Sequence, residues 1–527
     1  MRQGFDDIVV GAGPAGVVLA ARLSQDPDRR VLLIEAGPDY PDPARLPEDL
    51  RNGCTPSMVD HDWSLTAERP DGARLPLPRG RVVGGSSAVN SCIALRPEPE
   101  DFARWTELAG GTDWSWQDVL PYFNGLENDA DFSGPHHGSR GPLPLRRPAR
   151  SEFSPLSAAL VEAATAAGHP YVADHNAPGS TGVGPLPLNL ADGGRRVSAV
   201  AAYLDPARGR PNLTIAAGTL VDRVLFEGNT ATGVVTVSAG RTTRVYGDRV
   251  TLCAGAYATP ALLHRSGVGP AAHLRSLGVD VVADLPGVGA GLSDHSQVPI
   301  GVIPVPGLCD PSDPCAQVVL RYTAPGSDLP NDMQLYVLNH VELDVYAPHL
   351  ADRVPGGRAF MVTSNLMAPR GRGTVTTVSR SPEVLPRVSI DYTADAEDLR
   401  RQRAGVGLCR ELLRQPPFTA LTKELIGMDA VDAEAAGSTE RLDAYIRQAA
   451  RTAHHPMGTA RIGPAHDPDA VVDGRCRVHG TERLQVADAS VIPVPIRANT
   501  HLVALVIGER VAAWSAQEHT GREGSGT

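Results

Sequence analysis

Two adjacent histidines are the first residues whose type suggests chemistry. His454 and His455 lie in the segment AHHPMGTARIG, residues 453–463. An imidazole takes up or releases a proton near neutral pH, so either side chain could act as a general base. A third histidine, His501, lies in NTHLVALVIGERVA and is followed by an apolar run that predicts a helix. For these histidines to act in catalysis, helices and strands must hold them in place, and a substrate or cofactor must lie beside them.

A zinc site is a second interpretation of the same region. His454, His455, His466 and His479 lie within 26 positions, and Cys476 could add a thiolate. Their spacing follows no zinc-binding pattern. We therefore expect no metal site in this protein.

The N-terminal segment DDIVVGAGPAGVVLAARL predicts a strand, a glycine turn and a helix. Gly11, Gly13 and Gly16 match G-x-G-x-x-G, a pattern that lets a pyrophosphate approach the backbone and lets the helix pack closely on the strand. A second predicted strand ends in Glu35, 19 residues beyond Gly16. A carboxylate at that distance can accept hydrogen bonds from an adenosine ribose. The pattern predicts a dinucleotide site, disfavours NADP, and leaves FAD and NAD open.

Longer stretches of the chain resemble the glucose-methanol-choline (GMC) family of FAD oxidoreductases. The segment PRGRVVGGSSAVNSCIALRPEPEDFARW, residues 78–105, looks like the first family signature, and GAYATPALLHRSGVGP, residues 255–270, looks like the second. Similar stretches at 194–215, 285–295 and 484–512 follow in the family's order. The resemblance implies FAD as the cofactor and an alcohol as the substrate. It also implies oxygen or another electron acceptor as the second reactant.

The resemblance further implies which residues contact FAD. Val83 and the stretch 90–93 are expected to touch the flavin, the Val221 backbone to meet the adenine, and Asp488 with Ala489 to meet the ribityl and pyrophosphate groups. Val89 stands where some relatives carry a histidine that binds FAD covalently, so we expect non-covalent FAD. The full predicted set is Gly11, Gly13, Pro14, Ala15, Gly16, Glu35, Ala36, Val83, Gly85, Ser86, Asn90, Ser91, Cys92, Ile93, Val221, Asp488, Ala489 and Asn499.

The family motif also implies roles for the histidines. Its catalytic histidine directly precedes the residue occupied here by Pro456, which makes His455 the expected base. In an extended segment neighbouring side chains point to opposite sides, so His454 is expected to be a supporting residue. His501 is expected to hold the substrate oxygen, in a His–His arrangement like that of glucose oxidase. The alternatives are a hydroxynitrile lyase or a photodecarboxylase of the same fold, and a flavin-binding protein without catalysis.

We expect an α/β fold in which a Rossmann-like FAD-binding domain of the GMC/glutathione-reductase type is joined to an α+β substrate-binding domain with an antiparallel sheet. The runs QVVLRYTA, MQLYVLNHVELDVY and GTVTTVSRS predict strands of that sheet. The segment DAEDLRRQRAGVGLCRELLRQ predicts an amphipathic helix with its charges on a solvated face. The expected domains are 1–100, 190–297 and 453–527 for FAD, and 101–189 and 298–452 for the substrate.

Composition excludes other classes. The formal net charge of −11 and the lack of a basic run argue against a nucleic-acid partner. No apolar stretch reaches the roughly 20 residues of a membrane helix, and because the first residues lead straight into a predicted strand we expect no signal peptide. We expect the seven cysteines, Cys309 and Cys315 included, to be reduced thiols of a cytoplasmic protein. The polar tail SAQEHTGREGSGT is expected to be disordered.

Overall fold

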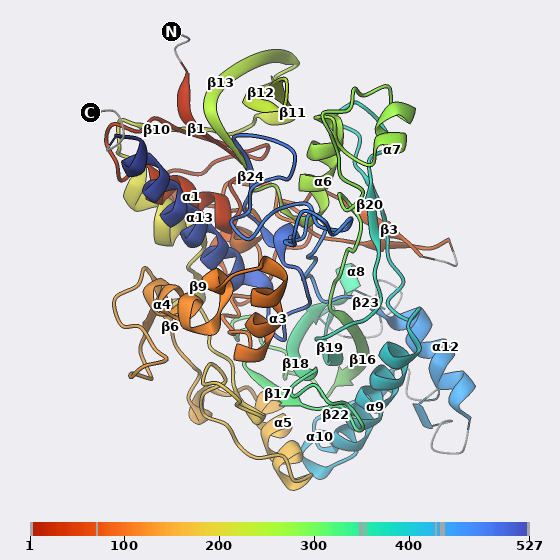
Figure 1. Cartoon of the computed structure of the whole chain (residues 1–527). Coiled ribbons are helices and arrows are strands. Elements are labelled where there is room, and N and C mark those ends of the chain that lie inside the picture. The colour runs from red at the N-terminus through yellow and green to blue at the C-terminus, as the bar shows by residue number, and fades with distance from the viewer. Residues whose placement is uncertain are drawn as a thin grey trace.

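The computed structural model describes residues 4–69, 72–346, 351–352, 354, 356–426, 429, 431–432 and 438–523. Two seven-stranded sheets form the framework of these residues. Figure 1 shows the first sheet in the upper half, close to both termini, and the second sheet in the lower half.

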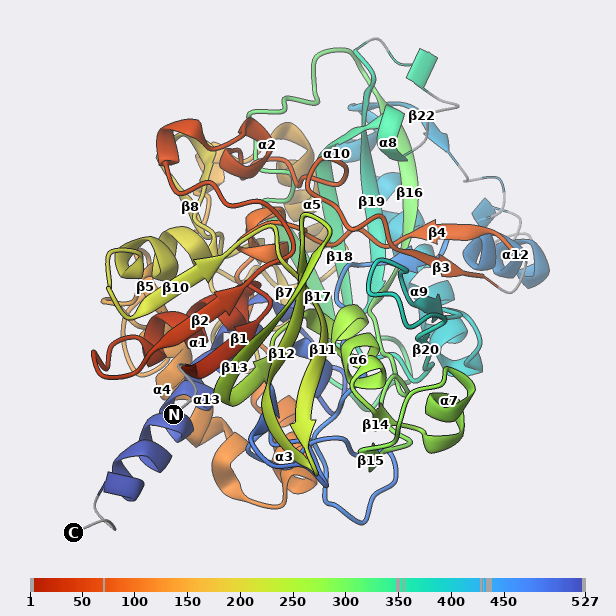
Figure 2. The ribbon, with the colours of Figure 1, turned by 90° about the horizontal axis from the view of Figure 1, so that it is seen from above.

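The first sheet has the order β10-β2-β1-β13-β12-β11, and β24 pairs with β13 off this path. Figure 2 shows these six strands side by side. Its parallel part is built from β1 (Phe5–Val10), β2 (Val31–Ile34), β10 (Leu213–Ala216), β24 (Leu484–Val486) and the end of β13 (Arg241–Leu252). Its antiparallel part is built from β13, β12 (Thr230–Ser238) and β11 (Leu220–Glu227). The predicted strand–glycine–helix unit and the second strand are confirmed.

Two helices from opposite ends of the chain pack together beside this sheet. They are α1 (Pro14–Leu23) and α13 (Thr500–Glu523). Gly508 permits the contact, because a Cβ there would lie 2.6 Å from the Ala15 carbonyl oxygen. Helix α13 continues through Glu523, so the prediction of a disordered tail is wrong for residues 515–523. Residues 524–527 lie outside the described residues.

The second sheet has the order β22-β16-β19-β18-β17-β7, and β23 pairs with β16. All of these strand pairs are antiparallel, which confirms the predicted type of sheet. The strands are β7 (Gly182–Pro185), β16 (Ser296–Pro304), β17 (Val318–Tyr322), β18 (Met333–Glu342), β19 (Arg358–Leu366), β22 (Thr422–Ile426) and β23 (Arg451–Thr452).

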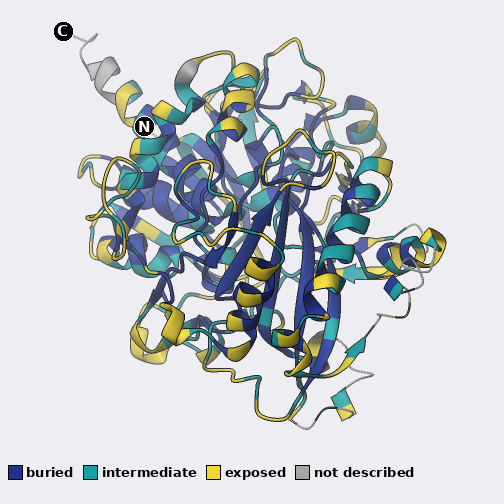
Figure 3. Cartoon of the chain, turned by 90° about the horizontal axis from the view of Figure 1, so that it is seen from below, coloured by how far each residue is buried: buried dark blue, intermediate teal, exposed yellow. Residues whose placement is uncertain are grey.

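Helices cover one face of the second sheet, and their apolar side chains share one core with that face. They are α5 (Pro155–Ala166), α9 (Ala396–Leu413), α10 (Pro416–Thr419) and α12 (Thr439–Ala449). Figure 3 shows the strands of this half as buried, with exposed residues on the surrounding helices and loops. The amphipathic helix is confirmed as α9, but its charges are not all solvated. Asp398 and Arg401 are buried, and Arg401 pairs with Asp398 and Asp332.

Two predicted strands are placed differently. The segment GTVTTVSRS forms only β20 (Thr374–Thr376), which lies in a separate four-stranded sheet of order β20-β21-β3-β4. The other strands of that sheet are β21 (Arg387–Ser389), β3 (Thr66–Glu68) and β4 (Arg74–Pro76). Strand β18 ends at Glu342, and the rest of its predicted run forms α8 (Leu343–Tyr346). Sequence alternation cannot distinguish these cases, because the strand partners are distant in the chain.

The remaining helices and strands lie outside the two large sheets. They are α2 (Glu48–Arg51), α3 (Pro99–Ala109), α4 (Trp116–Leu126), α6 (Gly255–Arg265), α7 (Ala271–Ser276), β5 (Glu127–Asp129), β6 (Leu143–Leu145), β8 (Leu190–Ala191), β9 (Arg195–Arg196), β14 (Val268–Gly269) and β15 (Ala283–Asp284). Phe102, Trp105 and Phe123 of α3 and α4 share a core with the first sheet, although we expected residues 101–189 to belong to the substrate domain. The domain boundaries stay a prediction.

All seven cysteines are free in the structure, and Cys309 forms no disulfide with Cys315. Cys315 is buried, and its thiol lies 3.6 Å from the His340 carbonyl oxygen. Among the described residues, no helix has the length and apolar character required to span a bilayer.

Candidate active site

A large cavity runs between the first sheet and the second. Its volume is about 2570 Å³ with its open mouth included. Residues of the glycine turn after β1 line one side, and residues of β16, β18 and β19 line another. His454, His455 and His501 all line this cavity.

The glycine turn has the shape that a dinucleotide needs. Gly11 has a φ of +100°, and a Cβ at Gly16 would lie 2.0 Å from the Gly11 carbonyl oxygen. These two glycines are therefore required for the turn and for the close packing of α1 on β1. A Cβ at Gly13 would meet nothing nearer than 3.8 Å, so the backbone there is open to a ligand. The N-terminus of α1 begins at this open position and favours a phosphate.

Two buried carboxylates hold backbone around this end of the cavity. Glu35 accepts hydrogen bonds from the N–H groups of Ala12 (3.0 Å) and Gly37 (2.9 Å). Burial raises the pKa of Glu35, and these hydrogen bonds oppose that rise. Asp488 accepts hydrogen bonds from the Gly255 N–H (2.8 Å) and the Thr259 hydroxyl (2.6 Å), which fixes the start of α6. The turn, the helix N-terminus and Glu35 together fit the adenosine and pyrophosphate of FAD.

The cavity brings together most of the residues predicted to contact FAD. Those that line it are Gly11, Gly13, Pro14, Ala15, Glu35, Ala36, Gly85, Ser86, Asn90, Ser91, Ile93, Val221, Asp488, Ala489 and Asn499. Gly16, Val83 and Cys92 are not among the lining residues. Gly16 lets α1 pack closely on β1, and Val83 lies in the hydrophobic core that contains the first sheet. Cys92 has a φ of +57° and lies in a separate apolar cluster. Its thiol is 3.7 Å from a guanidinium nitrogen of Arg196.

His455 is held at three points. Its Nδ1 lies 3.0 Å from His295 Nδ1, its Nε2 lies 3.0 Å from Asn499 Nδ2, and its backbone N–H donates to Asp294 (2.9 Å). Burial lowers the pKa of His455 well below its usual value, and His295, His454 and Arg79 lower it further. The ring is therefore neutral at neutral pH, which is the state that a general base requires.

His454 differs from the expectation of an extended segment. Its φ is +69°, so the chain bends at this residue, and both neighbouring histidines reach the cavity. The reasoning from alternating side chains was therefore wrong here. The His454 N–H donates to the Thr452 hydroxyl (2.7 Å), and its carbonyl oxygen accepts from the Arg79 guanidinium (3.0 Å). Burial lowers the pKa of His454 to about 3.

His501 lies in the first turn of α13 and forms no hydrogen bond with His455. The partner of His455 on this side is the amide of Asn499, a residue that we had assigned to the cofactor. His501 Nε2 is buried and has no hydrogen-bond partner among the described residues, and burial lowers the pKa of the ring to about 4. An unpaired nitrogen in a cavity wall can bind a ligand atom.

Sequence reasoning missed His295 and Asp294. Both are buried, and both contact His455 from the segment that leads into β16. The adjacent Asp and His at the end of LPGVGAGLSDH were a usable signal, because two polar residues there interrupt the start of a buried strand.

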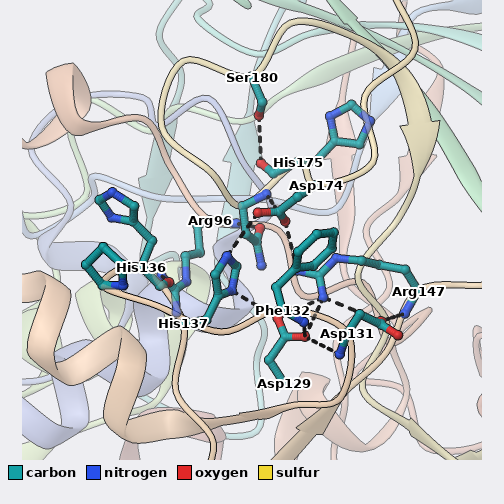
Figure 4. A network of polar contacts seen from close by, with 12 residues as sticks. Arg96, Asp129, Asp131, Phe132, His136, His137, Arg147, Asp174, His175 and Ser180 are labelled. Carbon is teal, nitrogen blue, oxygen red and sulfur yellow. Dashed lines mark hydrogen bonds and ion pairs between the residues drawn. The ribbon is translucent and has the colours of Figure 1, made fainter.

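Figure 4 shows a second polar cluster, and none of its labelled residues lines the cavity. Glu127, Asp129 and His137 are the one group of described residues with atoms close enough to share a metal ion. Arginines already pair with the carboxylates: Arg96 lies 2.7 Å from Glu127, and Arg147 lies 2.7 Å from Asp129. We interpret the cluster as a structural ion network. The histidines of the rejected zinc interpretation form no such group among the described residues.

The fold and the cavity together define a dinucleotide-binding α/β protein whose cavity is lined by a neutral histidine. The chain belongs to the GMC oxidoreductase family, since the N-terminal family model matches residues 5–297 and the C-terminal model matches residues 369–508. It is accordingly an FAD-dependent oxidoreductase that acts on CH–OH groups. The resemblance inferred from the sequence is confirmed.

Similar proteins cover nearly the whole chain. An uncharacterized GMC-type oxidoreductase from the thcA 5′ region of Rhodococcus erythropolis is 36% identical, with 96% of this chain and 97% of that protein covered. An oxygen-dependent choline dehydrogenase of Stenotrophomonas maltophilia is 34% identical, with 96% and 94% covered. The crystal structure of pyridoxine 4-oxidase from Mesorbium loti is similar with a TM-score of 0.86, 32% identity, and 98% and 99% of the two chains covered.

Proposed function

We propose that this enzyme oxidises an alcohol to a carbonyl compound with His455 as the catalytic base. The observation that carries the proposal is the neutral His455 ring, fixed at both nitrogens inside the cavity. When bound, FAD would supply the acceptor for the hydride that leaves the alcohol carbon. His455 takes the hydroxyl proton, the carbon–oxygen bond becomes a carbonyl, and oxygen or another acceptor later removes the two electrons.

The hydrogen bonds favour Nε2 of His455 as the atom that receives the proton. Asn499 donates its amide N–H to Nε2, which leaves the proton of the neutral ring on Nδ1 and directed at His295 Nδ1. The Asn499 amide occupies the single lone pair of Nε2, so a substrate hydroxyl has to replace that amide N–H before it can give its proton to Nε2. His501 offers its Nε2 to the same cavity, and we assign it to hold the substrate oxygen.

We also propose that FAD is bound without a covalent bond. Val89 lines the cavity and carries no nucleophilic atom, which supports this proposal. The purified yellow enzyme should release its flavin into the supernatant on acid precipitation. Flavin absorbance that remains in the washed pellet would contradict the proposal.

The assignment of His455 is tested by anaerobic stopped-flow bleaching of the flavin with an alcohol. Loss of a general base commonly lowers the rate by about 10²–10⁴-fold, and we expect that loss for His455→Ala. His454→Ala is the matched control, because it removes the neighbouring buried ring, which we expect to be a supporting residue, and its rate should stay within about tenfold of wild type. Both variants must first show full FAD occupancy.

The reverse pattern, a collapse for His454→Ala with His455→Ala unchanged, would transfer the role to the other histidine. Failure of every alcohol to bleach the wild-type flavin would favour the alternatives, a hydroxynitrile lyase, a photochemical flavoenzyme or a flavin-binding protein without redox catalysis.

A further inference from the structure

The wall of the cavity opposite the glycine turn is one face of the second sheet. In register, Gln297 lies opposite Asn365, Pro299 opposite Thr363, and Gly301 opposite Met361. On the next strand, Tyr336 lies opposite Thr363 and Leu338 opposite Met361. Strands β16, β19 and β18 belong to one sheet (Figure 1), and side chains on one face of a sheet alternate along each strand, so the register places these residues in rows across the three strands. We call this wall the floor, and its cavity-lining members are Gln297, Pro299, Tyr336, Leu338, Met361, Thr363 and Asn365.

The opposite face of the same strands is committed to the helices. Ser296 and Ser364 form hydrogen bonds with Gln402 of α9. Val298 and Val362 lie in the hydrophobic core that the second sheet shares with its helices. The register therefore sends Gln297 and Thr363 to the cavity without ambiguity, because a one-residue shift would bury these polar groups against the helices.

The floor changes from polar to apolar along the strands. Its first row holds the amides of Gln297 and Asn365, next to His295 at the start of β16. The second row holds Thr363, Tyr336 and Pro299, and the third holds Met361 and Leu338. The polar end of the floor thus lies next to His295 and the residues that it contacts. The apolar end lies two rows further along the strands, at Met361 and Leu338.

Gln297, Asn365 and Tyr336 of the polar rows each donate a hydrogen bond within the protein. The Gln297 amide N–H donates to the Thr452 carbonyl oxygen (2.7 Å), and the Asn365 amide N–H donates to the Thr363 hydroxyl (2.9 Å). The Tyr336 hydroxyl donates to Gln334. The rows therefore contribute neutral groups whose orientation is already fixed.

Charge on this side of the cavity is positive or absent. The acidic residues among the lining residues are Glu35 and Asp488, and both hold backbone N–H groups on the side of the first sheet. Arg451 is the register partner of Gln297 and lines the cavity, and Arg79 binds the His454 carbonyl oxygen. A cationic substrate would lose its water shell here without gaining a counter-ion.

We propose that the substrate is an uncharged alcohol with an apolar body, and that the cavity rejects a quaternary ammonium alcohol. The hydroxyl lies at the amide end of the floor, near His455, and the body lies on Thr363, Met361 and Leu338. This inference rests on the proposed alcohol oxidation and specifies its substrate class.

A matched series of alcohols tests the substrate class. Choline, 3,3-dimethylbutan-1-ol and 4-hydroxy-2,2-dimethylbutanoate carry a hydroxyethyl group on a cationic, a neutral and an anionic branched centre. We expect kcat/KM for the neutral alcohol to exceed that for choline by about 100-fold or more, because an unpaired cation is costly to bury. A kcat/KM for choline equal to that for the neutral alcohol would overturn the proposal. A higher kcat/KM for the anion would also overturn it, and would indicate that Arg79 and Arg451 bind a carboxylate.

A second measurement uses unbranched primary alcohols from butan-1-ol to octan-1-ol. Each methylene that reaches the apolar rows should raise kcat/KM by about fourfold until the floor is covered. A flat or falling series would contradict the apolar body. Anaerobic bleaching by none of these alcohols is a different result, because it would remove the proposed oxidation itself.

Gln297 is the position at which a charge can change the specificity. Gln297→Glu adds a carboxylate to the first row, and Gln297→Met removes the same hydrogen bond to Thr452 without adding charge. We expect the Glu variant to narrow the gap between choline and 3,3-dimethylbutan-1-ol by about tenfold or more, and the Met variant to leave that ratio near its wild-type value. An equal shift in both variants would show that charge at the floor does not set the preference.

Discussion

His455 depends on neighbours that come from two other parts of the chain. His295 lies at its Nδ1 and Asn499 at its Nε2, and Asp294 holds its backbone. His295 is fully buried, and burial lowers its pKa to about 4, so it faces His455 as a neutral ring. Because it contacts the proposed base and does not line the cavity, we expect His295 to act as a positioning residue that keeps the proton of His455 on Nδ1.

His295→Ala should lower the rate of flavin reduction by about tenfold or more. It should also shift the acidic side of the pH–rate profile, where the rate falls as the base is protonated, to higher pH. The pKa of His455 is lowered by burial and by His295, so wild type keeps a neutral base well below pH 6.5. Removal of His295 lessens both effects, and the base is then protonated at a higher pH. The measurement is the reduction rate against pH in stopped flow.

Two further variants separate positioning from a structural effect of His295. His295→Asn retains a side chain that can accept a hydrogen bond near the Nδ1 position, and we expect partial recovery of the rate. His264→Asn changes another buried histidine, which binds Thr377 and does not line the cavity, and the acidic side of its pH–rate profile should stay at the wild-type pH. A pH–rate profile of His295→Ala that falls at the same acidic pH as wild type would show that His295 does not lower the pKa of His455.

At the scale of elements, β16 links the two chemical functions of the cavity. The segment before it supplies Asp294 and His295 to the base, and its alternating residues supply Gln297 and Pro299 to the floor. Its other face packs against α9 through Ser296 and Gln402. A single strand thus fixes the base and the start of the floor relative to each other, because a strand is stiff and its side chains alternate.

Helix α13 has a similar double role. Its first turn supplies His501 to the cavity, and its later turns pack on α1 beside the glycine turn. The apolar run that begins at Leu502 is buried on several sides, which explains why this helix carries little polar pattern in its first half. The position of His501 is therefore tied to the same packing that supports the dinucleotide end.

At the scale of the whole molecule, Arg497 joins the two halves. Its guanidinium donates to Asp101 of α3 (2.7 Å) and to the Pro330 carbonyl oxygen (2.6 Å), and its carbonyl oxygen accepts from Gln334 of β18 (3.1 Å). Arg497 lies two residues before Asn499, so this connection also positions the partner of His455. Both charged side chains of the pair are buried.

Arg497→Gln should lower the free energy of unfolding by about 3–5 kcal/mol, because it leaves the buried Asp101 without its cation. Burial raises the pKa of Asp101 and Arg497 opposes that rise, so loss of the arginine favours the protonated acid. Urea unfolding of the FAD-loaded enzyme measures the effect, and the flavin-to-protein ratio should fall with it.

Glu100→Gln is the matched control for this prediction. Glu100 also pairs with Arg497, at 3.4 Å, but its side chain is 69% exposed, and exposed pairs contribute at most about 1 kcal/mol. A loss of stability for Glu100→Gln as large as for Arg497→Gln would argue against the buried pair as the connection between the halves.

The sequence by itself determined the features that are local in the chain. The strand, the glycine turn, α1 and Glu35 lie within the first 35 residues, and local sterics and hydrogen bonding select this unit. The long motifs also determined the family, and with it FAD and the histidine before Pro456. The amphipathic pattern of α9 predicted its helix but not the burial of Asp398 and Arg401, since that burial depends on a partner at Asp332.

Only the tertiary structure decided which side chains meet. His295 and His455 are 160 positions apart, and no local pattern encodes a 3.0 Å contact between them. The same holds for the pairing of β21 with β3 and for Asn499 in place of His501 at the base. Backbone conformation is also not local in the sequence pattern: Cys92 and His454 both have a positive φ, and only His454 lines the cavity. Packing across the whole chain fixes such contacts, because each depends on elements that the sequence places far apart.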